Sequence, residues 1–135
     1  MLWGMNGMKA QVSLEYLLLS LVALSLLSVS AFALLSIRDY SDEASKAHAF
    51  RSSALSLRDA INEVCVLGSG NGREVSLETG ISLGSEEGDD GWLVSFSHSD
   101  YSIVKASPCR VEASENLEGL VYVENEEGTV TVTER

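Results

Sequence analysis

The longest apolar stretch of the chain runs from Tyr16 to Ile37 without a single charged residue. As a helix, these 22 residues would measure about 33 Å, and the hydrocarbon core of a bilayer is roughly 30 Å thick. The pattern therefore predicts a helix that can cross a membrane. Lys9 precedes the stretch, and Arg38 is soon followed by three carboxylates. This weak charge bias favours a cytoplasmic N-terminus and an extracellular remainder.

A helical period of apolar residues continues beyond this stretch. The spacing alternates between three and four residues, as in a narrow stripe along an amphipathic helix: Ala47, Phe50, Ala54, Leu57, Ile61 and Val64. Residues 38–67 are thus predicted to extend the first helix, giving about 50 residues and roughly 75 to 80 Å in all. The alternative is two helices broken near Arg38 to Asp42, where Ser41 or Asp42 could cap the second.

From Gly68 onward the pattern changes to short strands and turns. Alternating apolar residues and turn clusters predict five strands: Arg73–Leu77, Trp92–Phe96, Tyr101–Lys105, Gly119–Val123 and Thr129–Thr133. The last two flank Glu124 to Gly128 and predict a hairpin. We expect an α+β fold, in which a long N-terminal hydrophobic helix packs by its C-terminal half on a small, mostly antiparallel β-sheet.

Charge excludes one class of function. The chain has 20 acidic and 9 basic residues among 135, a net charge of -11, which is unsuited to binding nucleic acid. The excess is concentrated from Gly84 to Arg135, where 12 acidic residues face 3 basic ones. That part should present an anionic surface.

Candidate chemistry is sparse. The segment Glu86 to Asp90 could bind calcium, but it lacks the alternating ligands of an EF-hand and is better interpreted as a solvated acidic turn. His48 and His98 are interpreted as ordinary surface or half-buried residues. No nucleophile–base pair and no phosphate loop can be assembled. We therefore expect no enzyme, no cofactor and no bound metal.

The two cysteines allow a disulfide. Cys65 is expected at the end of the helix, and Cys109 in a loop after the Tyr101 strand. In an extracellular domain an even pair is most simply a bond between the two. The chain-entropy model gives it a stabilising effect of about 4 kcal/mol. The alternative is two buried free thiols.

The residues just before the apolar stretch suggest how the N-terminus is processed. One interpretation is a cleaved secretory signal ending at Ala31-Phe32-Ala33, although the apolar run continues past it. A second is an uncleaved single-span anchor. A third follows from the order Lys9-Ala10-Gln11-Val12-Ser13-Leu14-Glu15-Tyr16. Its Gln11, Ser13 and Glu15, spaced Q-x-S-x-E before Tyr16 and an apolar helix, resemble the class III signal peptide of archaeal type IV pilin-like proteins.

This resemblance implies a division of the chain and a site of cleavage. A prepilin peptidase would remove residues 1–10 as a leader by cutting between Ala10 and Gln11, after the basic Lys9. Residues 11–37 would be the transmembrane and filament-core helix, residues 38–67 its amphipathic continuation, and residues 68–135 an acidic extracellular β domain. Glu15 would become the fifth residue of the mature chain, where pilins generally carry a glutamate.

The function that the resemblance implies is structural. The protein would be a subunit or minor component of a type IV pilus-like surface filament, with a role in adhesion conceivable. Its partners would be the peptidase, other pilin subunits, and the membrane before assembly. In the core of such an assembly, Glu15 could pair with the new α-amine of Gln11 on another chain. The alternative for Glu15 is a position at headgroup depth, favoured by the dipole of the helix N-terminus. The rival hypothesis from the residues is a single-span, membrane-anchored extracellular binding module.

Overall fold

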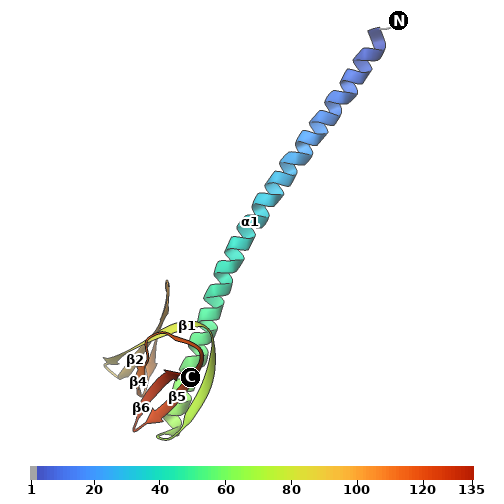
Figure 1. Ribbon diagram of the computed structural model, residues 1–135. Helices are drawn as coiled ribbons and strands as arrows, with labels where there is room; N and C mark the ends of the chain where they lie inside the picture. The colour runs from blue at the N-terminus through green and yellow to red at the C-terminus, as the bar shows by residue number, and fades with distance from the viewer. Residues whose placement is uncertain (1–2) are drawn as a thin grey trace. The chain divides into compact units, whose positions relative to one another are not determined.

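The computed structural model describes residues 3–135, with side chains from Gln11 onward. The chain forms one helix and six strands (Figure 1). Their bounds are α1 Trp3–Leu67, β1 Gly72–Gly88, β2 Gly91–His98, β3 Tyr101–Ser107, β4 Arg110–Ala113, β5 Leu117–Glu126 and β6 Thr129–Glu134. Contacts divide the chain into two units, Met1–Glu43 and Ala44–Arg135. Only the second has a hydrophobic core among the described residues.

Helix α1 begins within the predicted leader and is continuous. Every residue from Arg38 to Asp42 is helical, so the alternative of a break there is wrong. The helix ends at a glycine: Gly68 has a φ of 85°, a left-handed conformation that glycine adopts without strain. The side-chain amide of Asn71 donates to the carbonyls of Leu67, at 3.0 Å, and Gly68, at 3.2 Å. These bonds satisfy carbonyls that the helix end leaves unpaired.

The six strands form one sheet in the order β3-β2-β1-β5-β6-β4. All neighbours are antiparallel except β4, which runs parallel to β6. Strand β1 joins the two halves of the sheet. It pairs with β5 from Gly72 to Ile81, with a register shift between Leu77 and Ile81, and with β2 from Ser82 onward. The observed fold is thus the α+β arrangement predicted from the sequence.

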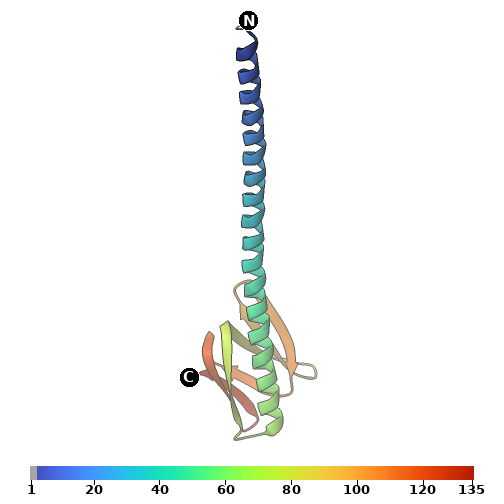
Figure 2. The same cartoon turned by 90° about the vertical axis from the view of Figure 1, so that its right-hand side faces the viewer.

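The core of the second unit lies between α1 and one face of this sheet. In Figure 2 the green part of α1 lies in front of the strands. Five members of the predicted helical stripe are buried, and Ala47 at its start is half-buried. The sheet contributes a matching set of buried side chains: Val75, Leu77, Ile81, Val94, Phe96, Val111, Leu117, Val121, Val123, Val130 and Val132. The stripe is therefore covered by the sheet, as expected.

All five predicted strands are present, with three differences. Strand β1 extends to Gly88, well beyond Leu77, and the short β4 was not predicted. The turn of the final hairpin is also shorter than predicted, because β5 continues to Glu126. The two turn residues, Glu127 and Gly128, have φ values of 52° and 90°, the pair of positive angles that a tight I′ hairpin turn requires.

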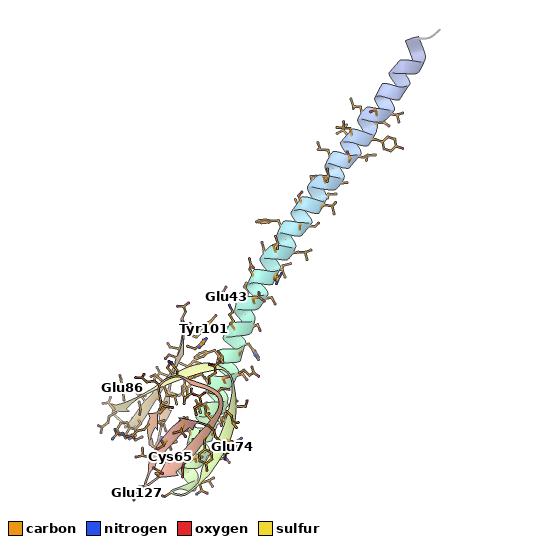
Figure 3. All side chains as sticks on the ribbon, in the orientation of Figure 1. Glu43, Cys65, Glu74, Glu86, Tyr101 and Glu127 are labelled. Carbon is orange, nitrogen blue, oxygen red and sulfur yellow. A yellow bond between two sulfur atoms is a disulfide. The ribbon has the colours of Figure 1, made fainter. Side chains whose placement is uncertain are left out.

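Cys65 and Cys109 form a disulfide with a Cα–Cα distance of 6.0 Å. Cys65 is labelled in Figure 3 near the end of α1, and Cys109 lies between β3 and β4. The predicted bond is therefore confirmed, and the alternative of two free thiols is wrong. It ties the last turn of the helix to the sheet.

A buried asparagine ties the same end of the helix to the final hairpin. Asn125 was expected in the turn, but it lies in β5 with 2% of its surface exposed. Its side-chain amide donates to the carbonyl of Val64 at 3.1 Å, and its side-chain oxygen accepts from the Gly128 amide at 3.0 Å. Its backbone exchanges bonds with Gly70 and Asn71. One residue thus joins helix, loop and hairpin.

Loss of the disulfide should destabilise the second unit. Replacing both cysteines, as Cys65→Ser with Cys109→Ser, releases a closed loop of 44 residues in sequence separation, so we expect unfolding to be easier by about 4 kcal/mol. The measurement is guanidinium unfolding of the full chain in mild detergent, followed by Trp92 fluorescence in a Trp3→Phe background. An unchanged midpoint relative to the oxidised parent would contradict a stabilising role.

Removing the side chain of Asn125 should also destabilise this unit. Asn125→Ala leaves the Val64 carbonyl and the Gly128 amide without their partner, which we expect to cost about 2 to 3 kcal/mol. The same unfolding measurement tests this expectation. Glu124→Gln, one residue earlier on the opposite face of β5, is the matched control and should change stability by less than about 0.5 kcal/mol. Equal effects of the two substitutions would argue against the Asn125 contacts.

Candidate functional site

The predicted processing motif lies on α1. The side chains of Lys9 and Ala10 lie outside the described residues, so the leader side of the cut is not characterised. On the other side, Gln11, Ser13 and Glu15 are helical and exposed, as is Tyr16 with 70% of its surface accessible. The residues on the C-terminal side of the predicted cut are therefore exposed, because no other part of the chain covers them.

Gln11 and Glu15 lie on the same side of the helix, whereas Ser13 faces away from both. Residues four apart are neighbours on a helix surface, and helical side chains tilt toward the N-terminus. The carboxylate of Glu15 is thereby directed back toward the turn that contains Gln11. If the chain were cut before Gln11, the new α-amine would be at the level to which Glu15 leans. The free amides and dipole of the new helix end would also favour a negative charge there.

The apolar segment after this motif is exposed on every side. Its large hydrophobic side chains, from Val12 to Tyr40, have between 48% and 76% of their surface accessible. Figure 3 shows these side chains around the helix along this part of α1. By length and composition α1 can cross a membrane, and none of its most apolar window is buried in the chain. A helix that is apolar all round requires apolar surroundings on all sides.

The serines of this segment add no unsatisfied hydroxyls. Each donates to a backbone carbonyl three or four residues earlier, at distances from 2.8 to 3.1 Å: Ser20, Ser25, Ser28, Ser30 and Ser36. At about 100° per residue they are spread around the helix and do not form a single stripe. Because their hydroxyls are internally bonded, they present small surfaces that another helix can approach closely.

Glu15 is the exception in this apolar segment. It is the only charged residue between Gln11 and Ile37. Among the residues from Gln11 onward, no ion pair includes it. A carboxylate in apolar surroundings is strongly unfavourable unless a cation compensates it. Glu15 therefore requires a position at the membrane interface or a positive charge nearby.

The outward side of the sheet carries a second notable group of residues. The strand register places Glu124 of β5, Thr131 of β6 and Glu112 of β4 in one row across the sheet. Glu74 and Glu126 lie on the same side in the rows before and after. We call Glu74, Glu112, Glu124 and Glu126 the acidic sheet face. Two of these carboxylates are already paired, Glu112 with Arg110 and Glu74 with Arg135, whereas Glu124 and Glu126 form no ion pair among the described residues.

The sequence analysis assigned negative charge to the whole C-terminal part and missed this face. The sequence does contain a sign of this face. Valines alternate with other residues in β5 and β6, and when the valines are buried the intervening residues lie on the opposite face of the sheet. The pairing of β4 with β6 was also needed, because it brings Glu112 beside Thr131.

The remaining sequence candidates stay separate from these two regions. Glu86 and Glu87 end β1, and Asp89 and Asp90 form the turn to β2. Among the described side chains, no group of three or more His, Cys, Asp or Glu could hold a metal ion. His48 is exposed, whereas His98 is half-buried against Phe50, with a ring-centroid distance of 6.4 Å.

Several open hollows lie on the described surface. One is lined by Tyr122, Thr133, Glu134 and Arg135. Another lies over the turn after α1, with Ser69, Gly70 and the carboxylates of the final hairpin. Neither of these two hollows gathers a nucleophile with a base.

Comparisons with protein-family models, with curated proteins and with solved structures find no match to this chain.

Proposed function

We propose that this protein is a structural subunit or minor component of a type IV pilus-like surface filament, processed between Ala10 and Gln11. The observation that carries this proposal is the apolar segment of α1, which is exposed all round in its own chain. Fully burying one leucine or valine side chain contributes about 1.5 to 3 kcal/mol. The segment contains many such side chains, so its surroundings must be lipid, other helices, or each in turn.

The Q-x-S-x-E motif supports helices as the final surroundings. In a plain membrane anchor, a carboxylate at the start of the span would lie at headgroup depth and have no partner to specify. In a bundle of identical helices, however, the α-amine created at Gln11 of one chain can neutralise Glu15 of another. Such a pair sets the axial register between subunits, because a shift leaves both charges unpaired in apolar surroundings.

The second unit suits the outside of such an assembly. Its core is filled by its own sheet and helix, and a disulfide closes it, which agrees with an oxidising location. The excess of carboxylates favours solubility and repels acidic surfaces. On this proposal the protein is the substrate of a prepilin peptidase, and its own role is assembly.

The native protein should begin at Gln11. Cleavage there removes residues 1–10, and N-terminal sequencing or intact mass of protein from its native membrane checks it, with allowance for a cyclised glutamine. A chain beginning at Leu34 would instead indicate secretory cleavage after Ala33. A chain beginning at Met1 would indicate the uncleaved anchor and the alternative function of a membrane-bound binding module.

Glu15→Gln should permit cleavage but prevent assembly. The substitution removes the charge that would pair with the amine, so we expect filament yield to fall by about tenfold or more while the processed chain remains in the membrane. Sedimentation of sheared filaments and electron microscopy measure the yield. Glu43→Gln, beyond the apolar segment, is the control and should assemble normally. Normal filaments from Glu15→Gln would contradict the pairing.

A further inference from the structure

The basic residues of the second unit fall into two groups. Three arginines make ion pairs: Arg73 with Glu63, Arg110 with Glu112, and Arg135 with Glu74. Within the side chains that the structure describes, four others make none: Lys46, Arg51 and Arg58 on α1, and Lys105 on β3. In a chain with more than twice as many acids as bases, this lack of partners within the chain is unexpected.

Two of these residues lie on one side of the helix. Arg51 and Arg58 are seven residues apart, nearly two full turns, so they share a face. We call this face the arginine flank; it consists of Ala47, Arg51, Leu55, Arg58 and Asn62 and contains no carboxylate. Arg51 is exposed, and the Nε atom of Arg58 is buried without a hydrogen-bond partner. The other four members of the flank are half-buried, so Arg51 is its exposed cation. Neither arginine has an ion-pair partner among the described residues.

We infer that the arginine flank of one copy docks onto the acidic sheet face of the next copy. This inference rests on the proposed function, in that it names the contact by which the outer units of neighbouring subunits meet. The binding partner is a second copy of this chain, because both complementary surfaces are present on it.

The spacings of the two surfaces agree. At 1.5 Å per residue, Arg51 and Arg58 are separated by about 10.5 Å along the helix axis. Glu112 and Glu124 flank Thr131 across three adjacent strands, and two strand spacings amount to about 9.4 to 9.8 Å. A helix laid across these strands can thus place one guanidinium near Glu124 and the other near Glu112. Arg110 contacts only the Oε1 atom of Glu112, which leaves Oε2 for a second cation. Long side chains absorb the remaining difference of about 1 Å.

The two surfaces cannot meet within one copy. Helix α1 packs on the inward face of the sheet, where the buried valines lie, whereas Glu112 and Glu124 belong to the alternate residues on the other face. Pairing is therefore between copies, and it joins two different surfaces. Such a heterologous contact leaves one free surface of each kind at the ends, so it continues into an open helical array unless the rotation closes a ring.

Charge also favours a copy of the same chain in this geometry. Each chain carries a net charge of -11, so most orientations of two copies repel each other. Contact through the arginine flank places positive charge against the acidic sheet face and removes local repulsion. The groups are mostly exposed, and the contact should weaken as salt screens them.

Charge reversal on each surface, separately and together, tests the docking. Arg51→Glu with Arg58→Glu should lower filament yield at low salt by about tenfold, and Glu112→Lys with Glu124→Lys should do the same. Combining all four substitutions in one chain restores opposite charges and should recover most of the yield.

Glu86→Lys with Glu87→Lys, near the end of β1, is the control. It makes the same change in net charge as the sheet variant and should leave assembly intact. Sedimentation and electron microscopy of full-length processed protein give the readout.

Folding is checked separately, because Arg58 is half-buried. Arg51→Glu alone should retain the disulfide and the unfolding midpoint of the parent and still reduce the yield. Normal assembly of both reversed variants at low salt would overturn the docking, and so would loss without recovery in the four-fold variant. If the arginine variants assemble normally but lose binding to vesicles of anionic lipid, the flank faces a lipid surface and the docking is overturned. Failure of the parent chain itself to form filaments would instead overturn the proposed function.

Discussion

The apolar segment of α1 has no cover within its own chain, and this is the main constraint on where the protein can reside. Its serine hydroxyls are bonded to the helix backbone, so nearly every group that it presents to its surroundings is apolar. Glu15 is the one charged exception. The surroundings must therefore be apolar along the length of the segment. A lipid bilayer meets this condition. In the proposed bundle of copies, free amines at Gln11 would also compensate the charge of Glu15.

The second unit differs from this segment, because its apolar side chains are buried between its own helix and sheet. The sheet buries the helical stripe, and two links hold the far end of α1 in place: the disulfide at Cys65 and the hydrogen bonds of Asn125 to the Val64 carbonyl and the final hairpin. The links differ in kind, since one restricts the unfolded chain and the other satisfies buried polar groups. A unit closed in this way needs no partner for its own stability. Its exposed charges are then available for contacts with other molecules.

Much of this arrangement could be predicted from local patterns, and the rest required long-range pairing. The stripe from Phe50 to Val64 and the alternating valines of the final hairpin have periods that identify helix and strand directly. Strand β4 has only four residues and exists because β6 lies beside it, which no local signal indicates. The second half of β1 is rich in glycine, serine and glutamate, a composition unfavourable for a strand, and pairing with β2 fixes it. Asn125 lies between two glutamates in the sequence and was therefore assigned to the turn. In the structure it belongs to β5, where its side chain is buried and hydrogen-bonded.

The two kinds of charged contact inferred for this protein would lie in different media, one apolar and one aqueous. They would therefore have different roles in assembly. Glu15 would meet its cation where the dielectric is low, so a single misplaced pair is strongly penalised and axial register follows. The arginine flank and the acidic sheet face would meet in water, where each pair is weak and salt-sensitive. Repetition along a filament makes such weak pairs sufficient to fix how each outer unit is turned toward its neighbour. A core that sets position and a surface that sets orientation can then be altered separately, because the residues responsible lie in different units of the chain.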